Sequence, residues 1–135
     1  MKVVQKELSL ILERLKKLDL YKVILIGSFA YGHPDKDSDV DLIVVTNDEY
    51  FPKNYQEKSN LYLKISNTLT DIAGMIPIDL IVYTKSMYNR FIQVGSLFSK
   101  KVSQKGVILY ETGNEGMAEQ SRKVTLILKG RGVYV

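Results

Sequence analysis

GSFAYGHPDKDSDVDL, residues 27–42, is the stretch that decides which fold this sequence predicts. It follows Lys22–Ile26 (KVILI), a short apolar run that indicates a buried strand. It leads into a second apolar segment, Val40–Val45, which predicts another strand. Between them, Phe29–Gly32 can form a short helix, and His33–Ser38 has the composition of a loop. The stretch therefore joins two strands through a turn, a helical segment and a polar loop.

Two aspartates open the second strand. Asp39 and Asp41 are one residue apart, so on a strand their side chains project from the same face, roughly 6.5–7 Å apart along the chain. Two carboxylates on one face repel each other unless a positive charge lies between them, and the DVDL segment contains no lysine or arginine. Mg²⁺ is the natural candidate, because it is typically held by one or two carboxylates together with phosphate oxygens and water. The alternative is that both aspartates merely face solvent at the end of the strand.

Two further positions fit the same chemistry. Gly27-Ser28 lies where a strand turns into a helix, and backbone N–H groups with a hydroxyl at such a turn can bind an anion; the alternative is an ordinary N-cap serine. Asp79 is the only charged residue in the segment 72–83, on a strand that we expect to be internal. An unpaired aspartate there would be costly, so Asp79 is a candidate third carboxylate for a second cation, or a base for an attacking hydroxyl. The alternative is a capping role at the strand entry after Pro77.

The rest of the chain predicts one sheet covered by helices. Apolar residues three and four positions apart indicate the helices, and short apolar runs indicate the strands. The predicted elements outside the first two strands are helices over 8–18, 53–72 and 84–94 (the last able to continue to 101), and strands over 76–83, 107–110, 124–128 and 133–135. Their order predicts the α/β (α+β) class, with residues 1–135 forming a single domain whose helices lie mainly on one face of the sheet.

The composition excludes several classes of protein. The chain has 135 residues, no cysteine and one histidine, His33, so disulfides, thiolate catalysis and His-rich metal sites are impossible. No apolar run approaches the ~18–20 residues of a membrane span, and no signal-peptide pattern opens the chain, so we expect a cytoplasmic protein with no membrane partner. The net charge of +4 divides into +3 over residues 1–22, −3 over 23–99 and +4 over 100–135. Without a basic stripe interleaved with aromatic residues, nucleic acid is not an expected partner.

Gly27-Ser28, ten intervening residues and Asp39-Val40-Asp41 form the pattern GS-x10-D-x-D, and a hydrophobic-Asp-hydrophobic strand around Asp79 follows. This pattern resembles the nucleotidyltransferase superfamily that shares its palm fold with DNA polymerase beta. In particular, it is similar to the minimal nucleotidyltransferase (MNT) domains, including antitoxins of the MntA type. The resemblance covers about residues 8–112, and a strand extension at about 121–135 lies beyond it. It implies a palm-type domain with a mixed sheet.

The resemblance also implies residue roles. Gly27 and Ser28 would bind the triphosphate of a nucleotide, whereas Asp39 and Asp41 would hold Mg²⁺. Asp79 would complete the site, giving three metal-binding and catalytic carboxylates, and two ions are expected. Many relatives carry arginine where this chain has Tyr31, so a possible positive contact is absent here. His33 and Lys36 lie in the same loop and are weaker candidates.

The implied activity is transfer of a nucleoside monophosphate from a nucleoside triphosphate, with AMP from ATP as the leading case. Because the chain is short, we expect a partner protein to supply the acceptor, and the resemblance implies a tyrosine of a HEPN-type toxin. Two alternatives stay open: nucleotidylation of a small molecule such as an aminoglycoside, with a homodimer forming the acceptor cleft, and a non-catalytic module that neutralises its partner by contact. The motif does not encode which nucleotide base is used.

Overall fold

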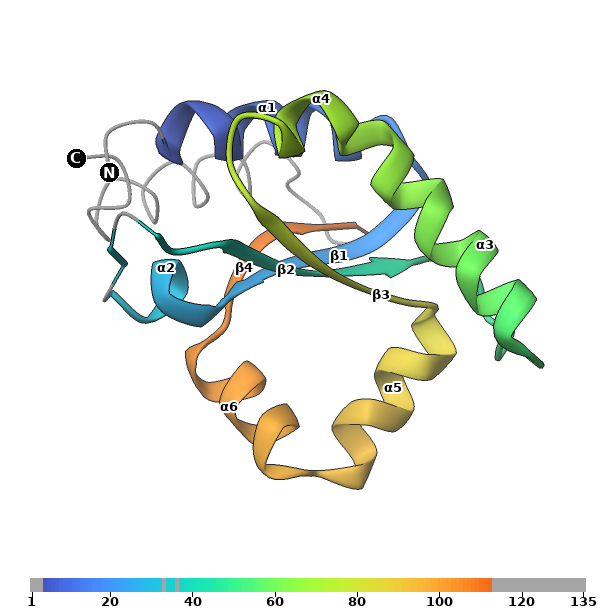
Figure 1. The fold of residues 1–135 in the computed structure, drawn as a ribbon. Helices are drawn as coiled ribbons and strands as arrows, with labels where there is room; N and C mark the ends of the chain where they lie inside the picture. Colours follow the sequence, from blue (N-terminus) through green and yellow to red (C-terminus); the bar gives the residue numbers. More distant parts are fainter. Residues whose placement is uncertain (1–3, 33, 36, 113–135) are drawn as a thin grey trace.

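A computed structural model describes residues 4–32, 34–35 and 37–112 (Figure 1). Six α-helices, one 3₁₀ turn and four strands make up this part of the chain. In chain order they are α1 (Val4–Leu15), β1 (Leu20–Ile26), α2 (Gly27–Tyr31), β2 (Val40–Thr46), α3 (Tyr55–Ser66), η1 (Asn67–Leu69), α4 (Thr70–Ala73), β3 (Ile78–Tyr83), α5 (Lys85–Val94), α6 (Leu97–Lys105) and β4 (Val107–Glu111).

The four strands form one mixed sheet in the order β3-β2-β1-β4. β1 pairs antiparallel with both β2 and β4, whereas β2 and β3 are parallel. Parallel neighbours need a crossover connection, and α3, η1 and α4 supply it. The predicted α+β class and mixed sheet are confirmed. Among the strands of the described residues β3 lies at an edge of the sheet, so the expectation that Asp79 sits on an internal strand is wrong for this part of the chain.

Helices cover both faces of the sheet. α1, α3 and α4 lie on one face and α5 and α6 on the other, as Figure 1 shows. On the first face, Leu8, Ile11 and Leu15 of α1 are almost fully buried. They belong to the larger cluster, which also contains Val40, Leu42 and Val44 of β2 and Val23 and Leu25 of β1. On the second face, Tyr88 of α5 and Val102 of α6 close a smaller cluster. The prediction of helices mainly on one face therefore describes the larger cluster only, because α5 and α6 cover the opposite face.

One predicted helix is divided, and another ends where it was predicted without continuing to residue 101. The helix expected over 53–72 stops at Ser66, where the Thr68 hydroxyl donates to the carbonyl oxygen of Ile65 at 2.7 Å and competes with regular helical pairing. The segment after residue 84 forms α5 and α6, because Gly95 adopts a left-handed conformation (φ 68°) that ends α5. Ser96 then caps α6 by accepting a hydrogen bond from the Ser99 N–H group.

The remaining sequence predictions for secondary structure hold within the described residues. Strands stand at the positions predicted from the apolar runs, and α1 begins four residues before the predicted helix. The strand extension at 121–135 lies outside the described residues. No helix in the described part of the chain is both long enough and apolar enough to cross a bilayer.

Candidate active site

Gly27 forms a tight junction between a strand and a helix. β1 ends at Ile26 and α2 begins at the next residue, with a positive φ of 74° at Gly27. A Cβ at this position would collide with the Oδ2 atom of Asp41 and would lie 3.0 Å from its Cγ atom. Glycine is therefore required at position 27 for two reasons. The positive φ disfavours other residues, and the Asp41 carboxylate occupies the space that a side chain would need.

Asp41 and Asp79 stand side by side on parallel strands. The register of β2 and β3 pairs these two residues directly, and Ile26 of β1 pairs with Asp41 on the other side. Side chains alternate along a strand, so Asp41 shares the face of Ile43 and Asp79 shares the face of Ile81. Ile43 belongs to the smaller cluster, which also contains side chains of α5 and α6, and Ile81 packs against it. Both aspartates therefore lie on the face of α5 and α6.

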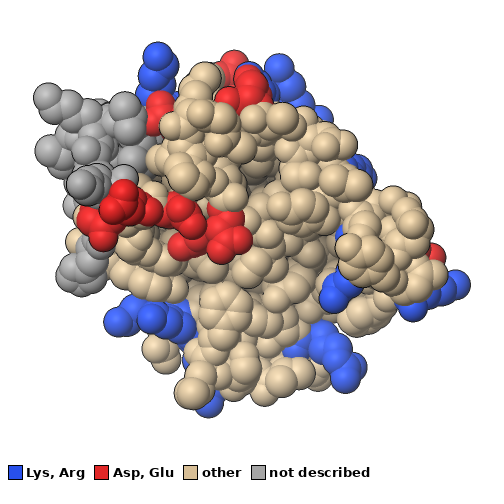
Figure 2. Space-filling view, viewed as in Figure 1, with Lys and Arg blue, Asp and Glu red and all other residues tan. Residues whose placement is uncertain are grey.

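The electrostatics of Asp41 reflect this crowding. Burial raises the pKa of the Asp41 carboxyl above its ordinary value, and the negative charges of Asp79 and Asp39 raise it further. Asp39 lies one residue before β2 begins, so it is close enough to act on Asp41 without being part of the strand. Acidic side chains gather beside α2 in Figure 2, with basic side chains on the α6 side below them. The site thus concentrates negative charge that a bound cation would relieve.

The donor set fits a hard cation such as Mg²⁺. Within the described residues, no three acidic or histidine side chains form a ready-made metal-binding group. Asp41 and Asp79 nevertheless converge from adjacent strands, and Mg²⁺ commonly takes only one or two carboxylates, with water and substrate phosphate as its other ligands. Oxygen ligands of this kind suit Mg²⁺ rather than softer metals.

A cavity of about 300 Å³ opens over these residues. Gly27, Asp41 and Asp79, which the sequence singled out, line it together. Its other lining residues are Ile26, Tyr31, Ile81, Phe98 and Lys101. Lys101 was missed by sequence reasoning, since it lies on α6, far from the motif along the chain, and has no local signature. Only the packing of α6 on the sheet brings it to the cavity.

The other sequence candidates occupy different positions. Ser28 lies inside α2 and is not its N-cap, because the N-cap is Ile26, which makes no side-chain capping hydrogen bond. The reading of Ser28 as an ordinary capping serine is therefore wrong. Asp39 is not among the residues that line the cavity. His33 and Lys36 fall outside the described residues.

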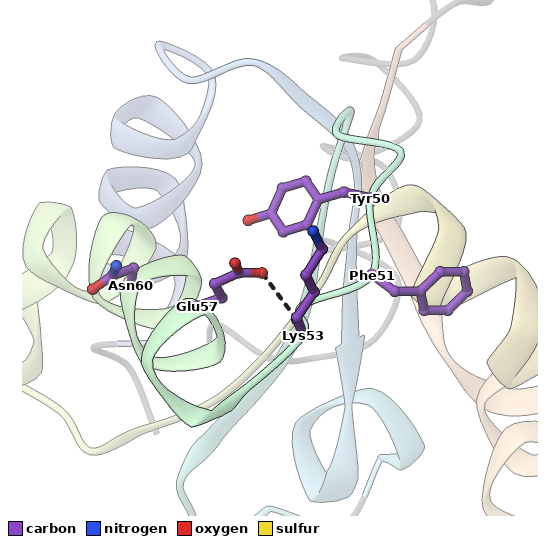
Figure 3. A pocket seen from close by; sticks show the side chains of 5 residues that line it. All are labelled: Tyr50, Phe51, Lys53, Glu57 and Asn60. Carbon is purple, nitrogen blue, oxygen red and sulfur yellow. Dashed lines mark hydrogen bonds between the residues drawn. The ribbon is translucent and has the colours of Figure 1, made fainter.

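A separate hollow of about 360 Å³ lies beyond the other end of β2 (Figure 3). Tyr50, Phe51, Lys53, Glu57 and Asn60 line it, and the Lys53 backbone N–H donates to Glu57 Oε1 at 2.9 Å. β2 runs from Val40 to Thr46, and the loop that follows it carries Tyr50, Phe51 and Lys53. This loop therefore leaves the sheet at the end of β2 opposite Asp41. The hollow contains none of the predicted site residues and is not part of the acidic cavity.

The fold places carboxylates on adjacent strands beside a glycine turn. A cavity of this kind is suited to binding an anionic substrate together with a hard cation. The sequence profile of the nucleotidyltransferase domain family matches residues 6–115. Because this match covers most of the chain, the protein belongs to the nucleotidyltransferase domain family. A comparison with curated proteins returns no match.

Solved structures agree with this fold. A toxin–antitoxin structure with AMP-PNP aligns with a TM-score of 0.50 at 17% identity, covering 92% of this chain and 91% of the other. A mutant of the toxin–antitoxin pair MntA–HpeT aligns with a TM-score of 0.47 at 14% identity, covering 93% and 92%. At 17% identity, the likeness to the structure with AMP-PNP establishes the fold alone.

Proposed function

We propose that this protein is a Mg²⁺-dependent nucleotidyltransferase that transfers AMP from ATP to a hydroxyl group of a partner protein. One observation carries the proposal: Asp41 and Asp79 are paired in register on parallel strands, and Gly27 leaves space beside them. The cost of this arrangement falls on Asp41, whose partial burial and proximity to the charges of Asp79 and Asp39 disfavour its ionised form, so this placement is best explained by a function.

The proposed roles follow from position. The backbone at Gly27 and Ser28 binds the triphosphate, because a glycine turn allows close approach and α2 begins there. Asp39 and Asp41 hold Mg²⁺, which when bound neutralises charge on the phosphate oxygens. Asp79 is exposed on the edge strand β3, where an incoming acceptor can reach it.

The chemistry is an in-line displacement. The acceptor hydroxyl oxygen bonds to the α-phosphorus as the bond to the bridging oxygen of the β-phosphate breaks, and pyrophosphate leaves. The hydroxyl proton passes to the Asp79 carboxylate or to water. Catalysis of this kind depends on positioning and on electrostatic stabilisation, and a site built on sheet strands supplies a rigid frame for both.

The proposed acceptor is a tyrosine of a HEPN-type toxin, which makes this chain an antitoxin. Support comes from the toxin–antitoxin neighbour with AMP-PNP, whose fold this chain shares over 92% of its length. Family membership supports the transferase activity, and the sequence resemblance to minimal nucleotidyltransferase domains supports the partner class.

The test is the intact mass of a HEPN-type partner after incubation with this protein, Mg²⁺ and ATP. We expect one or more AMP units to be added, and the addition to be lost in Asp41→Asn and Asp79→Asn. Glu49→Gln is the matched control, because it removes an exposed carboxylate from the loop beyond the far end of β2. Toxin neutralisation that survives both aspartate substitutions, in folded variants that still bind the partner, would contradict the proposal in favour of a contact-only antitoxin.

A further inference from the structure

Lys101 is the basic residue among those that line the cavity, whose other charged residues are Asp41 and Asp79. It comes from α6 and lines the same cavity as Gly27, Asp41 and Asp79. Its Nζ atom lies 4.9 Å from the centroid of the Tyr31 ring, in the range of a cation–π contact. Tyr31 is the last residue of α2, the helix that begins at Gly27. The ring that holds the lysine and the glycine turn are therefore parts of one short element.

Lys101 is not used to neutralise the aspartates. The ion pairs of the described residues join Arg14 to Asp71 and Lys22 to Glu111, and neither involves Lys101. A lysine that served only to balance buried carboxylates would be expected to contact one of them, because charge-assisted hydrogen bonds are the strongest that it can make. A contact with a ring face uses no hydrogen-bond acceptor, so among the described residues the ammonium group keeps N–H donors that can turn to a ligand.

We propose that Lys101 binds a phosphate oxygen of the nucleotide, with Tyr31 as the residue that positions it. This inference rests on the proposed function and adds a residue to that site. A triphosphate brings more negative charge than a single divalent cation neutralises, and a lysine is a flexible point charge suited to phosphate. The aspartates repel the nucleotide where no cation intervenes, so a cation on the α6 wall completes the charge balance of the cavity.

The arrangement makes α6 part of the binding site. Gly27 approaches the cavity from the sheet, whereas Lys101 approaches from the helix on the second face. The Tyr31 ring connects the two, so the orientation of α2 and the position of the lysine depend on each other. Loss of the ring should therefore weaken phosphate binding although the tyrosine itself carries no charge.

The test is isothermal titration of the full chain with two probes, ATP with Mg²⁺ and inorganic tripolyphosphate with Mg²⁺. Lys101→Met should weaken binding of both probes by about 10- to 100-fold, the range expected for one hydrogen bond between charged groups. Lys100→Met is the matched control, because it removes the same charge from the neighbouring position of α6, outside the cavity, and should change neither affinity. Circular dichroism confirms that each variant is folded.

Variants of Tyr31 separate positioning from a simple charge effect. Tyr31→Leu removes the ring and should reproduce part of the Lys101→Met loss, whereas Tyr31→Phe keeps the ring and should lose less affinity for both probes than Tyr31→Leu. Tyr31 lines the same cavity, so Tyr31→Arg combined with Lys101→Met returns a cation to it and should recover a measurable share of the affinity. A structural role of Lys101 would not be rescued in this way.

The outcomes distinguish the two proposals. Equal affinities of Lys101→Met and Lys100→Met for both probes would overturn the role of Lys101, while AMP transfer by the natural protein would leave the proposed function standing. Absence of binding and of transfer by the natural protein would overturn both. A loss seen with ATP but not with tripolyphosphate would also overturn this inference, because it would place Lys101 at the nucleoside.

Discussion

Gly27→Ala should damage the site more than it damages the fold. The substitution forces alanine into a backbone conformation with φ 74°, which costs about 1–2 kcal/mol. Its Cβ also meets Asp41, with the Cγ atom at 3.0 Å and the Cβ atom at 3.2 Å. Moving the Asp41 side chain away from its favoured rotamer costs about 0.5–1.5 kcal/mol more. We therefore expect the free energy of unfolding to fall by about 1.5–3.5 kcal/mol.

Gly32→Ala provides the matched control. Gly32 also has a positive φ, 87°, but an added Cβ there would meet no atom of the described residues within 4 Å. It should therefore lose only the backbone contribution of about 1–2 kcal/mol. Both variants place alanine at a positive φ, and only Gly27→Ala adds a contact with Asp41, so the difference between their free energies of unfolding reports chiefly on that contact.

Urea denaturation of both variants gives the free energies of unfolding, and AMP transfer to the partner gives the activity. Displacement of a reacting group by about 1 Å can cost on the order of 100-fold in rate, so Gly27→Ala should lose about that factor relative to Gly32→Ala. Transfer by folded Gly27→Ala at the rate of Gly32→Ala would refute the reasoning, because Asp41 would then not need the space that glycine leaves.

Three further substitutions test the electrostatics and the capping. In metal-free protein, the raised pKa of Asp41 means that stability declines as pH rises from about 4 through the pKa in the folded state, because the folded protein holds the proton more tightly. Asp41→Asn should remove this decline in urea denaturation curves, and added Mg²⁺ should raise the melting temperature of the natural protein but not of the variant. Arg14 lowers the pKa of Asp71 to about 2, so Arg14→Met should lower stability at pH 7 and lose its effect as pH falls from about 4 towards 2, followed by thermal melting. Thr84→Val should cost about 1–3 kcal/mol in denaturation, because the buried hydroxyl accepts from the Met87 N–H at 3.2 Å and donates to the Tyr50 carbonyl at 2.7 Å.

The sequence predicted those parts of the fold that local patterns control. Apolar runs located each strand from Lys22 to Tyr110, because a buried strand needs consecutive side chains for both faces. The end of the third predicted helix at Val94 is confirmed, and the left-handed conformation of Gly95 excludes the continuation to residue 101 that the sequence left open. The position of β3 at the edge could not be predicted, because strand order depends on contacts between distant segments. The error mattered for Asp79, whose exposure removes the burial penalty that the sequence argument assumed.

A site residue could be predicted from the sequence where its pattern would lower the stability of the fold unless it served a function. A glycine after a strand and aspartates at i and i+2 stand out in sequence, because neither pattern is favourable for stability alone. Lys101 carries no such cost, since an exposed lysine on a helix is ordinary. Its significance arises only from the cavity that α6 closes and from the Tyr31 ring beside it.

The direction of the strands explains why the site forms where it does. β1 is antiparallel to β2, and β2 is parallel to β3. The C-terminal end of β1 therefore lies beside the N-terminal ends of β2 and β3, at the same end of the strands. The chain leaves the sheet at this end through the turn at Gly27. Asp41 and Asp79 lie near the N-terminal ends of β2 and β3, so the same end of the sheet brings them beside that turn. The opposite face at the same level is filled by the larger apolar cluster, including Val40 and Leu42, which are fully buried. Alternation along β2 thus places Asp41 on the face of the smaller cluster, at the open end of the sheet, and Val40 and Leu42 in the larger core, so a one-residue shift in the register would place the carboxylate in that core.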